Sequence, residues 1–145
     1  MRQQPLVSVQ AYNLLPNHFH ILLTQIADGG ISEFIKRVAS GYTLYFNERY
    51  KRSGVLFQGT FKRVHVESSA QVQYLLAYIN ENRFVHGLPD DAEKITSSSE
   101  HYQGKRKDKL ITELLLDSAY SIQQARLLAK DIYRRRKGER LATFD

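Results

Sequence analysis

One short segment, residues 16–23, constrains the fold of this chain more than any other, and it reads Pro-Asn-His-Phe-His-Ile-Leu-Leu. Side chains of a strand alternate between its two faces, so residues 18–24 read as a strand with His18, His20 and Leu22 on one face. Residues 7–12 read as another strand, and residues 14–17 join the two. The sequence therefore predicts a β-hairpin that presents two neighbouring histidines.

The rest of the chain alternates between helical and extended patterns. Residues 31–50 carry apolar side chains at helical spacing, whereas residues 61–67 are rich in β-branched and aromatic residues and read as a strand. Ser68 or Ser69 is expected to cap a helix that runs to about His86. Gly87 and Pro89 are the expected stop of that helix.

The C-terminal part of the sequence is more polar at first. Residues 89–109 read mostly as a loop, and a short helix is expected at residues 110–117. A longer helix is expected at residues 121–137, opened by a capping box of Ser121 with Gln124. A helix-turn-helix across the junction of these two helices is an open alternative to simple packing.

Composition excludes several classes of protein. The chain has 145 residues and no cysteine, which rules out a disulfide scaffold, a thiolate zinc site and a cysteine nucleophile. The length suits one domain, or one domain with a helical appendage. We expect no membrane span and no leader sequence, because no apolar run is long enough for either.

The net charge of +6 is concentrated in two places. Residues 36–63 contain seven Lys and Arg against one Glu, and residues 130–140 contain six against two acidic residues. The first cluster is interleaved with aromatic residues, a mixture that suits phosphates and unpaired bases and so single-stranded nucleic acid. A solvated helix face beside core aromatics is the alternative. The interleaved aromatic residues are Tyr42, Tyr45, Phe46, Tyr50, Phe57 and Phe61.

Four residues are candidates for chemistry. Two neutral imidazoles, His18 and His20, side by side on a strand can share a divalent cation, although a hydrogen-bonded surface pair is an alternative. Tyr78 and Asn82 lie one turn apart on the flank of a predicted helix. A tyrosine can attack a phosphodiester when a metal draws charge from the phosphate, and an amide oxygen can bind that metal. The alternative is a tyrosine at the core edge and a polar residue in the last helical turn.

Six short segments follow one another in a distinctive order. They are residues 16–23, Tyr-Phe-Asn-Glu-Arg-Tyr at 45–50, Gly-Val-Leu-Phe-Gln-Gly-Thr-Phe-Lys at 54–62, Val-Glu-Ser at 66–68, Tyr-Ile-Asn-Glu-Asn at 78–82 and Ser-Ser-Ser-Glu-His-Tyr at 97–102. This order of motifs resembles the single-tyrosine HUH transposases, in particular the branch of REP-associated tyrosine transposases. The resemblance covers about residues 7–120.

The resemblance implies an α+β, ferredoxin-like fold, with an antiparallel sheet and helices on one face. Residues 1–90 would form the catalytic domain, and residues 91–145 a linker and C-terminal helical appendage. Family members normally begin with a strand and a helix before the hairpin, and we expect both to be missing here. A truncated product, a fragment of a longer protein, or a dimer that fills the gap would each account for that difference.

The resemblance also implies roles for particular residues. His18 and His20 would hold Mg²⁺ or Mn²⁺ with Asn82 as third ligand, and Tyr78 would attack DNA to form a 5′-phosphotyrosine. Tyr74, one turn earlier, is the alternative nucleophile. Apart from the resemblance, His65 would share a strand face with Phe61 and Arg63 and could relay a proton; a strand histidine without such a role is the alternative. The residues expected to contact DNA are Gln58, Lys62, Arg63, Arg49, Lys51 and Arg52.

The function expected from these observations is metal-dependent cleavage and rejoining of single-stranded or hairpin DNA. The alternative is a catalytically degenerate relative that binds structured DNA without cutting it. A replication or mobilisation nuclease of the HUH class is disfavoured by the short chain. We expect a homodimer located in the cytoplasm with the nucleoid and no association with a membrane.

Overall fold

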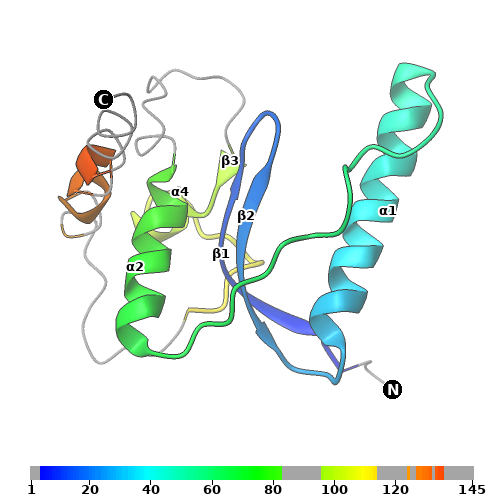
Figure 1. Ribbon diagram of the computed structural model, residues 1–145. Helices are drawn as coiled ribbons and strands as arrows, with labels where there is room; N and C mark the ends of the chain where they lie inside the picture. The colour runs from blue at the N-terminus through cyan, green and yellow to red at the C-terminus, as the bar shows by residue number, and fades with distance from the viewer. Residues whose placement is uncertain (1–3, 83–95, 114–123, 125–126, 132, 136–145) are drawn as a thin grey trace, which may run out of the picture. The chain divides into compact units, whose positions relative to one another are not determined.

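The computed structural model describes residues 4–82, 96–113, 124, 127–131 and 133–135. It has the mixed α+β class expected from the sequence, with an antiparallel three-stranded sheet, and is consistent with a ferredoxin-like fold with helices. None of the described helices is long and apolar enough to cross a bilayer. The elements in chain order are β1 (Val7–Leu14), β2 (Phe19–Gln25), α1 (Gly30–Tyr50), α2 (Ser69–Asn80), β3 (Thr96–Ser97) and α4 (Ser99–Tyr102) (Figure 1).

The predicted hairpin is confirmed as strands β1 and β2. The Leu15 N–H donates to the His18 carbonyl at 2.9 Å and closes the connection between them. Strand β1 lies in the middle of the sheet, in the order β2-β1-β3. It pairs antiparallel with β3, where Asn13 stands opposite Ser97. Because β1 is the central strand, it has a neighbouring strand on each side, β2 on one and β3 on the other.

The chain divides into two compact units, which are described separately. The first comprises residues 1–8 and 23–65, and its main element is α1. The Leu6 carbonyl accepts hydrogen bonds from the N–H groups of Ile26 and Ala27. Gly30 opens α1 directly against that carbonyl, where a β-carbon would collide with the Leu6 oxygen. Glycine is therefore required at the start of α1, and the predicted helix is confirmed.

The second unit comprises residues 9–22 and 66–145 and contains the hydrophobic core. Ala11 of β1, Leu22 of β2, and Leu76 and Ile79 of α2 are buried together. Helix α2 begins as predicted, because the Ser68 hydroxyl accepts the N–H of Gln71 at 3.2 Å. Since His18, His20 and Leu22 share one face of β2, the histidines lie on the face of the sheet that α2 covers.

Two sequence expectations for this part of the chain are wrong. Residues 61–67 were expected to form a strand, but they are extended without regular structure, and Val64 is 78% exposed. A strand persists only when it is paired, and no described strand pairs with this segment. Helix α2 ends at Asn80, with Glu81 as its C-cap, rather than near His86. The expected stop at Gly87 and Pro89 lies outside the described residues.

The C-terminal part also differs from expectation. The stretch expected as a loop contains β3 and α4. Residues 110–113 are not helical, because Ile111 forms a parallel bridge with Val9 and the Thr112 N–H donates to the Val9 carbonyl at 2.8 Å. The rest of that predicted helix, and the capping Ser121, lie outside the described residues, as does the proposed helix-turn-helix junction. Residues 124, 127–131 and 133–135 are helical, as predicted.

Candidate active site

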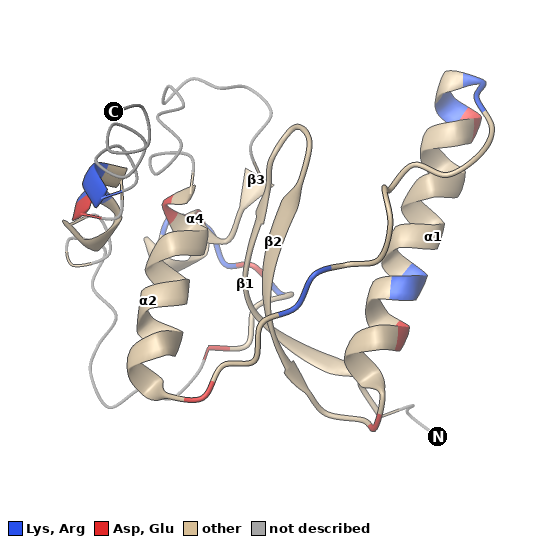
Figure 2. Cartoon of the chain, in the orientation of Figure 1, with Lys and Arg blue, Asp and Glu red and all other residues tan. Residues whose placement is uncertain are grey.

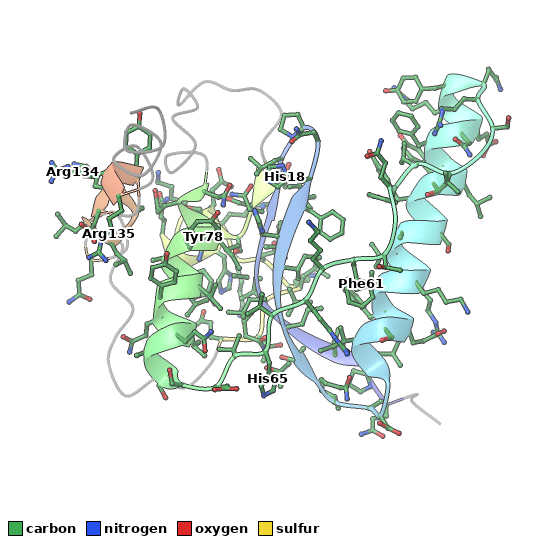
Figure 3. All side chains as sticks on the ribbon, viewed as in Figure 1. His18, Phe61, His65, Tyr78, Arg134 and Arg135 are labelled. Atoms are coloured by element: carbon green, nitrogen blue, oxygen red, sulfur yellow. The ribbon has the colours of Figure 1, made fainter. Side chains whose placement is uncertain are left out.

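The two histidines lie side by side at the start of β2. Their ring centroids are 5.1 Å apart, and the rings are nearly perpendicular at 88°. The His18 side chain is exposed, whereas His20 is half-buried. Figure 3 shows His18 close to the end of the hairpin that β1 and β2 form. The spacing predicted from the His-x-His pattern is therefore present in the structure.

His18 forms a hydrogen bond with the residue before it. Its Nδ1 lies 2.7 Å from the side-chain oxygen of Asn17. With that oxygen as the acceptor, Nδ1 carries the proton and Nε2 is the nitrogen left to bind a metal. Histidines that bind metals characteristically donate their other ring N–H to an oxygen in this way. The Asn17 contact has the form seen at such histidines.

Tyr78 of α2 completes a cluster with the histidines. Its ring centroid is 5.7 Å from that of His20, in an edge-on arrangement. The Tyr74 ring lies nearly parallel to that of Tyr78, with their centroids 6.3 Å apart. Tyr78 is half-buried and also packs against the helix that contains Leu128 and Ala129. The structure thus brings a half-buried tyrosine to the histidine pair, with Tyr74 one turn further away.

Asn82 lies two residues beyond the end of α2. It is fully buried, and neither its Oδ1 nor its Nδ2 has a hydrogen-bond partner within the described part of the chain. A buried amide without partners costs about 1–3 kcal/mol, so it is rarely retained without a ligand or a function. The donor set of two imidazoles and an amide oxygen suits Mg²⁺ or Mn²⁺.

Within the described ranges, no three His, Cys, Asp or Glu side chains come together as a metal site. The described carboxylates therefore do not form such a cluster with His18 and His20. An amide oxygen such as that of Asn82 is a donor type that Mg²⁺ and Mn²⁺ accept, so the chemistry of the predicted residues is compatible with such an ion.

Hydrogen bonds from the sheet hold the end of α2, a feature that sequence reasoning missed. The side-chain N–H of Asn13 donates to the Ile79 carbonyl at 2.9 Å, and the Ser98 hydroxyl donates to the Asn80 side-chain oxygen at 2.5 Å. All of these polar groups are buried. The only sequence signal was the motif at residues 97–102, which composition alone reads as a loop.

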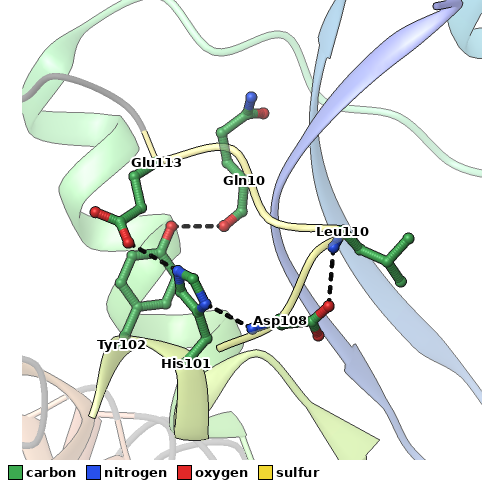
Figure 4. Close-up of polar contacts among 6 residues, drawn as sticks. All are labelled: Gln10, His101, Tyr102, Asp108, Leu110 and Glu113. Atoms are coloured by element: carbon green, nitrogen blue, oxygen red, sulfur yellow. Dashed lines mark hydrogen bonds and ion pairs between the residues drawn. The ribbon is translucent and has the colours of Figure 1, made fainter. Parts of the chain in front are cut away.

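A second polar network ties residues 101–113 to β1 (Figure 4). His101 accepts the Asp108 N–H on Nδ1 and lies 2.8 Å from the Glu113 carboxylate through Nε2. The Tyr102 hydroxyl donates to the Gln10 carbonyl at 2.6 Å. Burial, followed by the negative charge of Glu113, raises the pKa of Tyr102 to about 12. This network supports the middle strand of the sheet on which the site depends.

The basic residues expected to contact DNA all belong to the first unit and are exposed. Figure 2 shows Lys and Arg gathered at the C-terminal end of α1. Arg52 there is already engaged, since its guanidinium donates to the side-chain oxygen of Asn47 at 2.9 Å and to the Val55 carbonyl at 3.1 Å. The hydroxyl of Tyr50 beside Arg49 raises the pKa of that arginine. The remaining expected contacts, all exposed in the loop and extended segment after α1 or at its end, are Lys51, Gln58, Lys62 and Arg63.

Comparison with known families decides the class of this protein. The family model described as Transposase IS200 like matches residues 2–82, which include both histidines, Tyr78 and Asn82. The chain belongs to the IS200-like transposase family. No curated protein and no solved structure matches it significantly. The transposase family expected from the motifs is thus confirmed for this IS200-like chain, and the narrower REP-associated branch stays a prediction.

Proposed function

We propose that this IS200-like transposase cleaves and rejoins single-stranded or hairpin DNA through a covalent 5′-phosphotyrosine at Tyr78. The main support is the ring contact between Tyr78 and His20 at 5.7 Å, beside a histidine whose tautomer suits metal binding. Family membership supplies the DNA chemistry. The REP-associated branch is part of this proposal because it accounts for the full series of motifs up to residue 102.

In the proposed reaction, the Tyr78 oxygen attacks the phosphorus of the scissile phosphodiester. The bond from phosphorus to the 3′-oxygen breaks, the tyrosine proton passes to water, and the leaving 3′-oxygen takes up a proton from solvent. The phosphotyrosine bond preserves the energy needed for rejoining, in which the 3′-OH attacks and Tyr78 is released. No oxidant or cofactor turnover is needed.

His18, His20 and Asn82 would hold Mg²⁺ or Mn²⁺. When bound, such a cation withdraws charge from the phosphate and lowers the barrier to attack. The Asn17 oxygen orients His18, and the ring of Tyr74 packs against that of Tyr78. The side chains of this chain would therefore provide a ligand set and a nucleophile whose ring contacts both His20 and Tyr74.

The exposed aromatic face of α1 supports a single-stranded substrate. Tyr42, Tyr45 and Tyr50 are 49%, 55% and 60% exposed. They form a ladder with Phe46, whose ring centroid is 4.5 Å from that of Tyr50. Arg49 lies over the Tyr50 ring at 6.0 Å. Aromatic faces beside cations stack on unpaired bases with little sequence preference, which fits a looped or single-stranded DNA.

A labelled DNA hairpin with single-stranded flanks, incubated with the protein and Mn²⁺, tests this proposal. Wild type should form a denaturant-resistant adduct, and Tyr78→Phe should abolish it while leaving DNA affinity within about twofold, because only the nucleophilic oxygen is lost. Tyr74→Phe is the matched control and should still form the adduct. Loss in Tyr74→Phe alone would make Tyr74 the nucleophile. Binding without any adduct in wild type would overturn the proposal in favour of a non-cleaving relative.

A further inference from the structure

The last turn of α2 is held to the sheet at two successive residues, Ile79 and Asn80. Asn13 of β1 donates its side-chain N–H to the Ile79 carbonyl at 2.9 Å. This carbonyl is among the last four of the helix, which have no regular partner within it. Ser98 donates its hydroxyl to the Asn80 side-chain oxygen at 2.5 Å. Both anchors directly follow Tyr78 in the sequence.

Ser98 is itself fixed to the middle strand. Its N–H donates to the Tyr12 carbonyl at 3.0 Å, and its hydroxyl oxygen accepts the Tyr12 N–H at 3.0 Å. The hydroxyl has one proton, and Asn80 at 2.5 Å is closer than the Tyr12 carbonyl at 3.3 Å. Ser98, Asn13 and Asn80 are 0%, 0% and 3% exposed, so water does not compete for these bonds.

The two anchors tie consecutive helical positions to two different residues, the Ile79 carbonyl to Asn13 and the Asn80 side chain to Ser98, and together they oppose rotation of the helix. Side chains extend to about 5–6 Å from a helix axis, so a rotation of about 10° displaces them by about 1 Å. A displacement of that size is enough to cost about 100-fold in a reaction that needs aligned groups. The rotation of α2 therefore decides where the Tyr78 oxygen lies relative to the histidines.

We propose that Ser98 and Asn13 are positioning residues that set the rotation of α2 and so direct Tyr78 toward the histidine pair. The kinetic part of this inference rests on the proposed function, whereas the geometric part concerns only the contact between Tyr78 and His20. Neither residue touches DNA or metal in this proposal. Their effect passes through the two hydrogen bonds to α2.

Ser98→Ala tests the inference, with Ser97→Ala as its matched control on the same segment. The Ser97 hydroxyl accepts the Ser99 N–H at 3.3 Å, and among the described residues it forms no hydrogen bond with α2. Ser98→Ala should lower the single-turnover rate of covalent attachment at least 10-fold, with DNA affinity within about twofold. Ser97→Ala should leave both unchanged. Equal losses in the two variants, or a normal rate in Ser98→Ala, would overturn the proposal.

A second measurement does not depend on activity. The Tyr78 ring shifts the NMR signals of the His20 ring protons, and Tyr78→Leu gives the reference without that ring. In Ser98→Ala the His20 signals should move toward this reference. If wild type forms no adduct, the proposed function fails, but these shifts still test the positioning. Wild-type shifts in a folded Ser98→Ala would contradict it.

Asn80→Ala breaks the same hydrogen bond from the helix side, which keeps the test decisive if Ser98→Ala does not fold. It should reproduce the rate loss and the His20 shift. The loss in the double variant should be smaller than the sum of the two single losses, because both substitutions remove one shared interaction. Additive losses would indicate two separate structural defects and would contradict a shared positioning bond.

Discussion

A substitution of Asn17 should weaken the proposed metal binding by His18. Its side-chain oxygen accepts the Nδ1–H of His18 at 2.7 Å. Asn17→Ala removes this acceptor, so the ring is no longer held in one tautomer and orientation. The expected result is an affinity for Mn²⁺ lower by about 10-fold or more. Titration of Mn²⁺ monitored by electron paramagnetic resonance measures it.

Asn17→Asp is the control for that change, since a carboxylate oxygen at the same place also accepts the Nδ1–H. Its Mn²⁺ affinity should equal or exceed that of wild type. Equal affinity of wild type and Asn17→Ala would show that the Asn17 contact does not prepare His18.

Replacing Asn82 should change stability and metal binding in opposite directions. Its buried amide forms no hydrogen bond within the described residues, so Asn82→Leu loses none and removes a desolvation cost. The free energy of unfolding should rise by about 1 kcal/mol, while Mn²⁺ binding weakens. Urea denaturation in the absence of metal measures the first effect. A fall of several kcal/mol would show that the amide is satisfied and structural.

The start of helix α1 depends on the close contact between Gly30 and the Leu6 carbonyl. Gly30→Ala would put a β-carbon onto the Leu6 carbonyl oxygen, and backbone cannot move aside cheaply. The free energy of unfolding should fall by about 1–3 kcal/mol, the usual cost of overpacking. Urea denaturation followed by circular dichroism at 222 nm measures this change.

Gly41 is the matched control in the same helix, because no atom lies within 4 Å of an added β-carbon. Gly41→Ala should raise the free energy of unfolding by about 0.5–1 kcal/mol, since alanine loses less backbone entropy. If the two substitutions had the same sign and size, contact with Leu6 would not explain the glycine at the start of α1.

At the scale of the whole molecule, Tyr102 links stability to alkaline pH. Burial and the charge of Glu113 raise the pKa of Tyr102 to about 12, whereas the unfolded value is 10.0. A raised folded pKa means that the stabilisation is complete below pH 10 and is lost as the pH rises toward 12. The free energy of unfolding of wild type should therefore fall across this interval.

Tyr102→Phe removes the titrating hydroxyl together with its bond to Gln10. Its free energy of unfolding should be lower than that of wild type near pH 9, and the difference between the two proteins should shrink as the pH rises. Urea denaturation at several values between pH 9 and 12 provides the comparison. A constant difference would indicate that Tyr102 does not titrate differently in the folded state.

The sequence predictions that are confirmed concern features set by residues close together in the chain. Alternation in residues 18–24 predicted that His18 and His20 share a face, and helical spacing predicted α1. The capping serine predicted the start of α2, because a cap depends on residues three positions apart. The proximity of Tyr78 to His20 was expected only from the resemblance to a family.

The remaining features depend on partners distant in the sequence. Residues 61–67 have the composition of a strand, but no described strand pairs with them. Ile111 was predicted to be helical, but it forms a β-bridge with Val9. The bonds from Asn13 and Ser98 to α2 arise only when segments distant in the sequence meet. By itself, therefore, the sequence determined the periodic elements and the residues available for chemistry. Only the tertiary structure decided which strands pair and how Tyr78 lies against His20, because those energies come from contacts between distant segments.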